Sequence, residues 1–275
     1  MSGRTIIITG ASDGIGAAAA RELSARGDTV VVVGRSPQKT AAVADELGVD
    51  HLVADFSRLD DVRALAATIL ERYPRIDVLA NNAGGIMGER ELTVDGFEKT
   101  FQVNHLAPFL LTSLLSERLV SSRATVIATA SVANRLYGHL DLDDLGNERA
   151  YSPNKAYGDA KLANILFARE LDRRFGDSGI ASVSFHPGVV RTGFATQSTS
   201  PMRFFYNAFC IFLLRPAKGA DTLVWLATTT PGTDWKTGGF YTKRKLDFTT
   251  NPQADDAALA SALWERSAAL VGVPA

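Results

Sequence analysis

Two tyrosine–lysine pairs lie within residues 151–161, YSPNKAYGDAK, and either could form an acid–base site. Tyr151 precedes Lys155 by four residues, and Tyr157 precedes Lys161 by the same interval. A free tyrosine has a pKa of about 10 and exchanges protons slowly at neutral pH, whereas a nearby ammonium stabilises the phenolate and lowers that pKa. A pair on one face of a helix could therefore exchange a proton with a substrate oxygen.

The start of the surrounding helix distinguishes the two pairs. Ser152 followed by Pro153 is typical of an N-cap and a first helical residue. Tyr151 then lies outside the helix, so its spacing to the next lysine has no geometric meaning. Tyr157 and Lys161 lie inside it, on one face, about 6 Å apart along the axis. We expect Tyr157 and Lys161 to react, and Tyr151 to be a packing or pocket-rim residue.

Short β-branched segments alternate with longer amphipathic segments around this helix. The short segments are continuously apolar, which is typical of a parallel sheet covered on both faces. This alternation predicts a doubly wound parallel sheet in a three-layer α/β/α sandwich, and no linker divides residues 1–275, so we expect one domain. Strands are expected at 5–9, 29–34, 50–54, 76–80, 124–130 and 180–185, and helices at 14–26, 38–47, 59–72, 96–119 and 153–175.

A glycine-rich turn follows the first expected strand and opens a helix. Its glycines are Gly10, Gly14 and Gly16 in TGASDGIG, a spacing that differs from the commoner G-x-G-x-x-G. Glycine permits a tight turn and close backbone approach, and a helix N-terminus offers free N–H groups to a pyrophosphate. The turn's place between a strand and an alanine-rich helix favours a dinucleotide site over an ordinary strand–helix turn.

The end of the second expected strand, VVVVGRSPQKT, carries no carboxylate that could bind the ribose 2′-hydroxyl of NAD. Arg35 stands there instead, and its planar guanidinium could pair with a 2′-phosphate, assisted by Lys39 and Ser12. A solvated surface arginine is the alternative. The sequence therefore predicts NADP(H) as the cofactor in preference to NAD(H).

An ordered set of motifs resembles that of the short-chain dehydrogenase/reductase family over about residues 4–195. The resemblance implies a Rossmann-type fold, a nicotinamide cofactor and hydride transfer between a carbonyl and an alcohol. The long stretch between Ser131 and Tyr157, with AYGDAKLANILFARELDRRF, resembles the retinol-dehydrogenase-like branch. The motifs are TGASDGIG (9–16), NNAG (81–84), Asn104 in FQVNHL, Ser131 in ATASVA, YGDAK (157–161) and HPGVVRT (186–192).

The resemblance also implies roles for single residues. Tyr157 would exchange a proton with the substrate oxygen, while Lys161 would tune it and bind the nicotinamide ribose. Ser131 would hydrogen-bond the reacting oxygen, and Asn104 would hold a water that links Lys161 to solvent. The cofactor-binding residues would be Gly10, Ser12, Gly14, Ile15, Gly16, Arg35, Lys39, Asp55, Asn82, Ala83, Gly84, Tyr157, Lys161, Pro187, Val190 and Thr192.

Some of these assignments keep an alternative. Asp55 would accept from the adenine amino group, or it could cap the next helix. Asn82 and Ala83 would meet the adenosine ribose, and Gly84 would allow close approach. The Val190 backbone and the Thr192 hydroxyl would bind the nicotinamide carboxamide. His186 is expected to be structural, because Tyr157 already fills the role of the base.

Bulk composition narrows the partners. The net charge of −1 and the lack of a long basic run argue against nucleic acid. Cys210 is the one cysteine, which excludes an internal disulfide and fits a reducing compartment. No signal peptide or bilayer-length apolar stretch is visible, so a cytoplasmic protein is expected. A small-molecule substrate, no metal and, from the resemblance, a homo-oligomer complete the expectation.

The segment after Thr192 predicts a substrate lid at about 193–216. GFATQSTSP is small and polar, and MRFFYNAFCIFLLRP after it is apolar nearly all round. An apolar lid would exclude water and favour a lipophilic or bulky substrate. A core helix, a subunit interface and a peripheral membrane contact are the alternatives.

The expected function is an NADP(H)-dependent carbonyl reductase or alcohol dehydrogenase. A sugar-nucleotide epimerase also uses Tyr-x-x-x-Lys, but such enzymes resemble T-G-x-x-G-x-x-G at the first turn and need a larger C-terminal domain. A non-catalytic binding or scaffold protein is the other alternative. The joint presence of Asn104, Ser131, Tyr157 and Lys161 argues against it.

Overall fold

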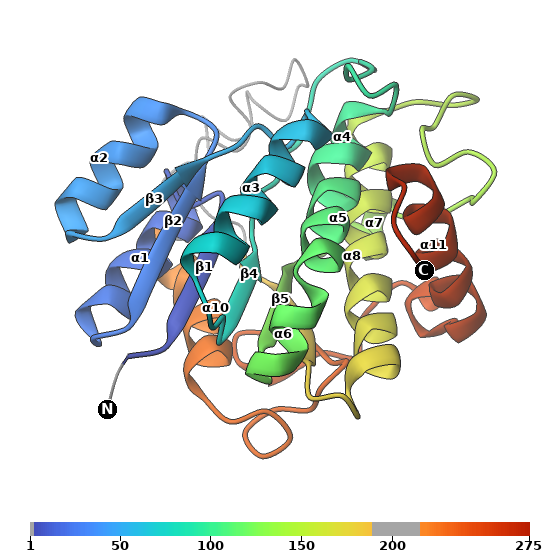
Figure 1. Ribbon diagram of the computed structural model, residues 1–275. Coiled ribbons are helices and arrows are strands. Elements are labelled where there is room, and N and C mark those ends of the chain that lie inside the picture. The colour runs from blue at the N-terminus through green and yellow to red at the C-terminus, as the bar shows by residue number, and fades with distance from the viewer. Residues whose placement is uncertain (1–2, 189–214) are drawn as a thin grey trace.

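Eight strands form one sheet in the computed structural model, which describes residues 3–188 and 215–275 (Figure 1). Their order is β3-β2-β1-β4-β5-β6-β7-β8, with all neighbours parallel except the antiparallel pair β7 and β8. Strands β2 and β3 extend the sheet on one side of β1, and β4 then pairs with the other side of β1. The strands are β1 Thr5–Thr9, β2 Thr29–Gly34, β3 Asp50–Val53, β4 Val78–Asn81, β5 Thr125–Thr129, β6 Ala181–His186, β7 Phe240–Thr242 and β8 Lys245–Leu246.

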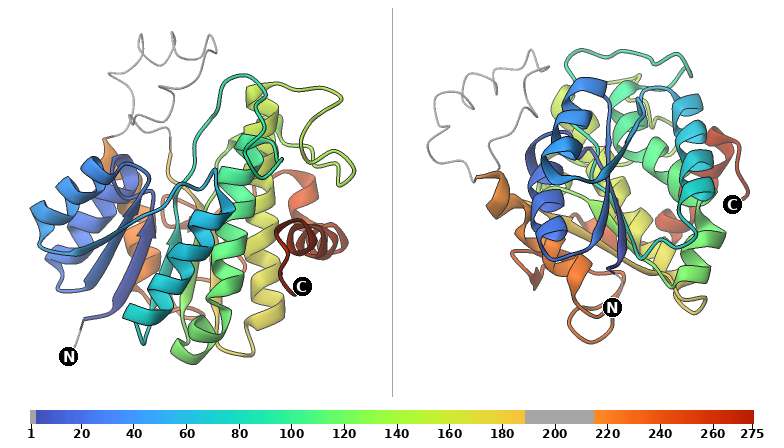
Figure 2. Two further views of the ribbon diagram at one scale, coloured as in Figure 1. Left: turned by 45° about the horizontal axis from the view of Figure 1, so that its top comes forward. Right: turned by 60° about the vertical axis from the view of Figure 1, so that its left-hand side comes forward.

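Helices cover both faces of the sheet and give the predicted α/β/α sandwich (Figure 2). Helices α1, α2 and α10 cover one face, and α3, α5 and α8 cover the other, with α11 outside α8. Alternation along β1 explains the two cores, since Ile6 and Ile8 lie in one and Ile7 in the other. The helices are α1 Gly14–Ala25, α2 Pro37–Leu47, α3 Leu59–Arg72, α4 Lys99–Phe101, α5 Ala107–Leu114, α6 Ser116–Ser122, α7 Ala133–Tyr137, α8 Pro153–Phe175, α10 Pro216–Thr228 and α11 Ala257–Val271.

The predicted strands and most predicted helices are confirmed, with ends shifted by two residues at most. The single helix expected at 96–119 is wrong. That region divides into α4, a π-helical turn at Gln102–Leu106, α5 and α6. Gly96 has a φ of 83°, so it belongs to the preceding turn, and Glu98 caps α4 instead. Strands β7 and β8 were not predicted.

Helix α8 begins where the sequence predicts it. The Ser152 side chain accepts a hydrogen bond from the Lys155 backbone N–H at 3.2 Å, and Pro153 occupies the first turn. Tyr151 precedes the cap and is not helical. The helix is 23 residues long and almost wholly buried between β5, β6 and α11 over its first four turns. Its N-terminal half therefore has a fixed position at the carboxyl edge of the sheet.

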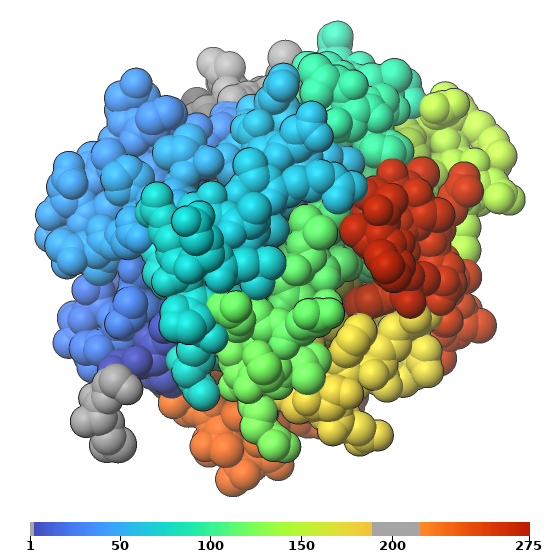
Figure 3. All heavy atoms as spheres, in the orientation of Figure 1, coloured from blue at the N-terminus to red at the C-terminus, as the bar shows by residue number. Residues whose placement is uncertain are grey.

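An aromatic cluster holds the C-terminal helix α11 against α5 and α8. The Trp264 ring stacks on Phe167, with centroids 5.8 Å apart and planes at 6°, and meets Phe109 edge-on at 4.9 Å. The Arg174 guanidinium lies 5.1 Å from the Trp264 ring. Figure 3 shows α11, in red, lying against the yellow and green surface formed by α8 and its neighbours. The end of the chain is thus part of the main core.

Two predictions concern parts of the chain that the structure only partly covers. The predicted lid at about 193–216, together with Val190 and Thr192, lies outside the described residues except for its last two residues, where Pro216 begins α10. Within residues 3–188 and 215–275, no helix is long and apolar enough to cross a membrane.

Candidate active site

The candidate residues gather where parallel strands end. β1, β4 and β5 pair side by side and stop at the same edge. The glycine turn follows β1, NNAG begins at the last residue of β4, and Ser131 follows β5. Helix α8 begins beside this edge with Tyr157 and Lys161. Ligands of open α/β sheets bind in this position, outside the carboxyl ends of the strands.

The glycine turn has room for backbone but not for side chains. A Cβ on Gly10 would lie 2.7 Å from Ala83 Cα, and one on Gly16 would lie 2.4 Å from Gly10 O. The φ of Gly10 is 65°, which other residues rarely adopt. The Asn82 side-chain Nδ2 donates to Thr9 O at 2.9 Å and ties β4 to the turn. With the N-terminus of α1 beside it, this turn fits a pyrophosphate.

One charge at this turn was missed at the sequence level. Asp13 is the N-cap of α1, and its Oδ1 accepts from the Gly14 N–H at 2.7 Å. The carboxylate lies 3.9 Å from the Lys39 Nζ. Lys39, which was expected to assist phosphate binding, thus has an acidic neighbour. The TGASDGIG motif contains this residue, and its acidic character was the available signal.

The structure places Arg35 and Ser12 together at the end of β2. Arg35 directly follows β2 and is exposed. A Cβ on Gly34 would lie 2.7 Å from Ser12 Cβ, so the glycine lets the two segments touch. An exposed arginine that directly follows a strand end packed against a serine can receive a phosphate dianion there.

Asp55 takes part in a local turn after β3. Its Oδ1 accepts from the Ser57 N–H at 2.9 Å and from the Ser57 hydroxyl at 2.8 Å. It does not cap α3, whose N-cap is Arg58. Both bonds use Oδ1, so the Oδ2 atom of Asp55 can still accept from an adenine amino group.

Asn104 joins the loop after β4 to the π-helical turn. Its Nδ2 donates to Thr100 O at 2.8 Å and to Gly85 O at 2.9 Å, and its Oδ1 accepts from the Gly85 N–H at 3.1 Å. Asn104 lies inside the π-helical turn, in which the Ala107 N–H bonds Gln102 O, five residues back. Both amide protons are used, so a water at this side chain would have to donate to it.

Lys161 lies beneath the ring of Tyr157. Its Nζ is 5.4 Å from the ring centroid and donates to Thr129 O at 3.0 Å, and the residue is 2% exposed. Burial lowers the pKa of Lys161 to about 7. Tyr157 is buried with Ile86 and Ala133, which brings the loop after β4 and helix α7 against α8. This arrangement places the Lys161 side chain beside the Tyr157 ring in the first turns of α8.

The second pair is not an acid–base pair. The Tyr151 hydroxyl donates to Gly88 O at 3.1 Å and lies 3.4 Å from the Glu98 carboxylate. Burial and that carboxylate raise the pKa of Tyr151 to about 12. The Lys155 Nζ pairs instead with the buried Asp159 at 2.6 Å. Tyr151 and Lys155 have different partners, so their four-residue spacing has no chemical consequence.

Ser131 follows β5, and His186 ends the neighbouring strand β6. The Ser131 Oγ accepts from the Ala133 N–H at 3.2 Å at the start of α7, which packs on α8. His186 ends β6 at 7% exposure, and burial lowers its pKa to about 4, so it is neutral near pH 7. Pro187 follows at the same edge.

Two further polar residues behind Lys161 were not singled out from the sequence. Asn164 is three residues after Lys161 and shares its face of α8, and its Nδ2 donates to the same Thr129 oxygen at 3.1 Å. His105 follows Asn104 and contacts Asn164. The i, i+3 spacing from Lys161 was the available signal for Asn164. No sequence signal indicated the contact with His105, which lies 59 residues from Asn164.

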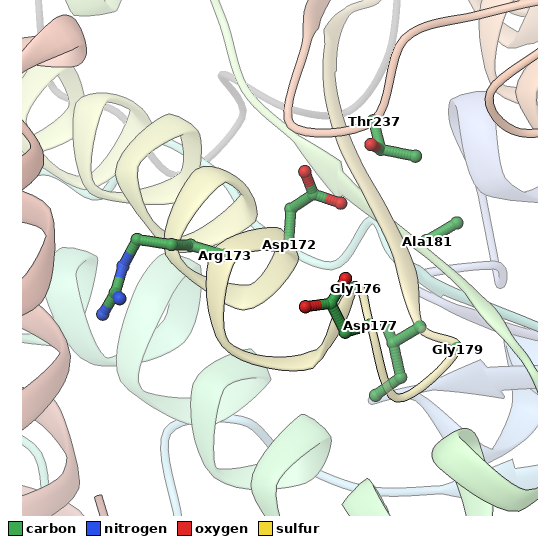
Figure 4. Close-up of a pocket in the computed structure, with 8 residues that line it drawn as sticks. Asp172, Arg173, Gly176, Asp177, Gly179, Ala181 and Thr237 are labelled. Carbon is green, nitrogen blue, oxygen red and sulfur yellow. The ribbon is translucent and has the colours of Figure 1, made fainter.

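A pocket of about 480 Å³ lies elsewhere (Figure 4). It is lined by the C-terminal end of α8, the turn before β6 and Thr237. Asp172 in this pocket is about 16 Å along α8 from Lys161, at 1.5 Å per residue. The pocket therefore belongs to the opposite edge of the sheet from the candidate active site.

Comparisons with known proteins identify relatives over nearly the whole chain. A family model described as short chain dehydrogenase matches residues 4–203. The protein named "Putative daunorubicin C-13 ketoreductase DnrU", from Streptomyces sp. (strain C5), is 47% identical, over 99% of this chain and 94% of its own length. Retinol dehydrogenase 13 of Homo sapiens is 36% identical, over 99% of this chain and 86% of its own length.

Solved structures agree in fold. A crystal structure of an uncharacterized protein from Mycobacterium Paratuberculosis has a TM-score of 0.79 and 34% identity, covering 98% of this chain and 94% of the other. The Pseudomonas aeruginosa RhlG/NADP active-site complex has a TM-score of 0.69 and 26% identity, covering 87% and 94%.

The close packing at Gly84 generates a test of the site's geometry. A Cβ there would lie 2.3 Å from Asn104 Oδ1 and 3.2 Å from Lys161 Nζ. Because three hydrogen bonds hold the Asn104 amide, we expect Gly84→Ala to lower the free energy of urea unfolding by about 1–3 kcal/mol and to weaken the binding of a reduced nicotinamide cofactor, measured by fluorescence. Gly146→Ala is the control, since its Cβ would come no closer than 3.4 Å to any neighbour, at the tip of Arg90. Equal effects of the two substitutions would contradict the assignment.

Proposed function

Since the chain belongs to the short-chain dehydrogenase family, in its retinol-dehydrogenase-like branch, we propose that it is an NADP(H)-dependent reductase of bulky, lipophilic ketones. Family membership makes it an oxidoreductase that transfers hydride with a nicotinamide cofactor. The observation that carries the proposal furthest is the buried Lys161 ammonium 5.4 Å from the Tyr157 ring.

The residues at the sheet edge supply the proton chemistry. The nicotinamide, when bound, supplies the hydride to the carbonyl carbon. The Tyr157 hydroxyl gives its proton to the carbonyl oxygen as negative charge develops there, and the Lys161 ammonium stabilises the resulting phenolate. The Ser131 hydroxyl donates a hydrogen bond to the same oxygen. In alcohol oxidation the proton moves in the reverse direction.

The cofactor end of the proposal rests on the turn after β1 and the end of β2. Gly10, Gly14 and Gly16 allow the pyrophosphate to approach the backbone and the N-terminus of α1. Arg35 follows β2 where NAD-binding folds place a carboxylate, and Ser12 touches the same strand end. The RhlG structure, which is similar in fold, is a complex with NADP.

The substrate class rests on apolar surroundings and on the relatives' names. Ile86 and Ala133 pack against Tyr157, and the next turn of α7 exposes Leu136 and Tyr137 at 57% and 43%. The relatives are named for a ketone of daunorubicin and for retinol. We propose a substrate with a large apolar or aromatic framework that covers these side chains.

Exchanging each tyrosine for phenylalanine tests the catalytic assignment. Tyr157→Phe removes the proton donor, so we expect turnover to fall at least about a thousandfold while NADPH binding stays within about twofold. Tyr151→Phe removes a hydrogen bond to Gly88 O outside the proposed chemistry, so turnover should fall less than about fivefold. Comparable losses of kcat in both variants would refute the choice of Tyr157.

The cofactor preference is tested by dissociation constants for NADPH and NADH. Charge-assisted pairing with the 2′-phosphate contributes ~1.5–3 kcal/mol, which corresponds to roughly ten- to a hundredfold. We expect that preference for NADPH in the wild type and most of its loss in Arg35→Ala. Arg58→Ala, an exposed arginine before α3, should leave the ratio unchanged. Tighter binding of NADH by the wild type would overturn the proposal.

A ketone panel tests the substrate class. Initial rates of NADPH oxidation should give kcat/KM at least about tenfold higher for polycyclic aromatic ketones than for small polar ketones, because the large framework buries more apolar surface. Tyr137→Ser should reduce this ratio, whereas Val94→Ser, an exposed apolar residue on another loop, should not. Equal kcat/KM values across the panel would exclude a bulky-substrate site, and no turnover of any carbonyl would exclude the reductase.

A further inference from the structure

We propose that Asn164 is a positioning residue that fixes Lys161 through the Thr129 carbonyl, and that His105 and Ser267 extend this control to the C-terminal helix. The inference rests on the proposed function, since it concerns the lysine of that site. It assigns to α11, which lies outside the helical layer, a part in ordering the reactive pair.

Thr129 O is the shared element. It ends β5, and its oxygen accepts from Lys161 Nζ at 3.0 Å and from Asn164 Nδ2 at 3.1 Å. A carbonyl oxygen has two lone pairs, so the two donors occupy both. Asn164 therefore determines which direction remains for the ammonium. Without it, the Lys161 side chain could approach the oxygen from either side.

A chain of hydrogen bonds continues from Asn164 to α11. Its Oδ1 lies 3.4 Å from His105 Nδ1, and His105 Nε2 lies 2.9 Å from the Ser267 Oγ. Asn164, His105 and Ser267 are 5%, 2% and 0% exposed, so water does not compete for these groups. Three elements, α8, the π-helical turn and α11, are joined by side chains alone.

The donor and acceptor capacity of each group determines the direction of every bond in this series of hydrogen bonds. Thr129 O can only accept, so the Asn164 amide must present Nδ2 to it and Oδ1 to His105. His105 must then carry its proton on Nδ1, which leaves Nε2 as the acceptor of the Ser267 hydroxyl proton. Burial lowers the pKa of His105 to about 4, which keeps the ring neutral and this single direction in place near pH 7.

The rigid packing of α11 makes this chain an effective support. Trp264, one turn before Ser267, is fixed between Phe109 and Phe167. The Ser267 hydroxyl is thus held at a constant position relative to α5 and α8. Four hydrogen bonds in series connect Ser267 to Lys161. Removing the Ser267 hydroxyl should therefore affect Lys161 only through Asn164.

A double-variant cycle tests this order. Asn164→Leu should lower kcat about tenfold and weaken NADPH binding several-fold, with ketone KM within about twofold. Ser267→Ala should change kcat and NADPH affinity in the same direction by about two- to fourfold. The double variant should be no worse than Asn164→Leu alone, because both substitutions interrupt one chain. Multiplicative losses in the double variant would overturn the link to α11.

Matched controls separate positioning from general destabilisation. Leu166→Ala lies in the core on the same helix, and Ser261→Ala lies on α11 outside the chain. Leu166→Ala should lower the free energy of unfolding yet keep kcat and NADPH affinity, and Ser261→Ala should change none of them. If Leu166→Ala reproduces the losses of Asn164→Leu, the positioning role is refuted.

A replacement variant and a binding measurement test the proposal even if Asn164→Leu does not fold or no ketone is turned over. If Asn164→Leu does not fold, Asn164→Ser removes the Nδ2 donor and replaces it in the cycle. NADPH affinity, measured by fluorescence without substrate, reports on Lys161 even if no ketone is turned over. In that event the reductase proposal fails while the binding cycle still supports or refutes the positioning of Lys161 by Asn164.

Discussion

The burial of one lysine ammonium organises the candidate site. Removing an ammonium from water is costly, which is why burial lowers the pKa of Lys161 to about 7, and Thr129 O at 3.0 Å is an acceptor for its N–H groups. That oxygen is available because β5 ends at Thr129 and its neighbours in the sheet stop at the same edge. The position of the Lys161 Nζ therefore depends on three features: where the strands end, where α8 begins, and the absence of a side chain at Gly84.

The same constraint explains the break in the helix that contains Asn104. There the Ala107 N–H bonds Gln102 O, five residues back, and the Asn104 Nδ2 donates to Thr100 O, four residues back. The gain is a rigid bridge to Gly85, directly beside the glycine that Lys161 approaches. The irregular, π-helical part of this region thus lies where the loop after β4 is held next to Lys161.

The sequence predicted what short-range patterns determine. Apolar β-branched runs located the first six strands, and Ser152 with Pro153 located the start of α8, because each signal lies within a few residues. The bridge between Asn104 and Gly85 was not predictable, since it joins residues 19 apart in the sequence. The bond between His105 and Ser267 spans 162 residues and is set by packing of α11 alone. The predicted site residues that the structure describes lie at one edge of the sheet. The hydrogen bonds of Asn164, His105 and Ser267 behind Lys161 did not follow from the sequence.

The two tyrosine–lysine pairs show why spacing needs a helix boundary to have meaning. Both pairs have the same interval, but Tyr151 lies before the N-cap and turns toward Gly88 and Glu98, while Lys155 is held by Asp159. Asp159 also accepts from the His139 N–H and from the Asn147 Nδ2, and so ties the long segment after α7 to α8. Lys155 and its partner Asp159 thus stabilise the surroundings of Tyr157 and Lys161. Residues that match a catalytic pattern by spacing can be retained for packing, and the geometry of the helix start decides between the two.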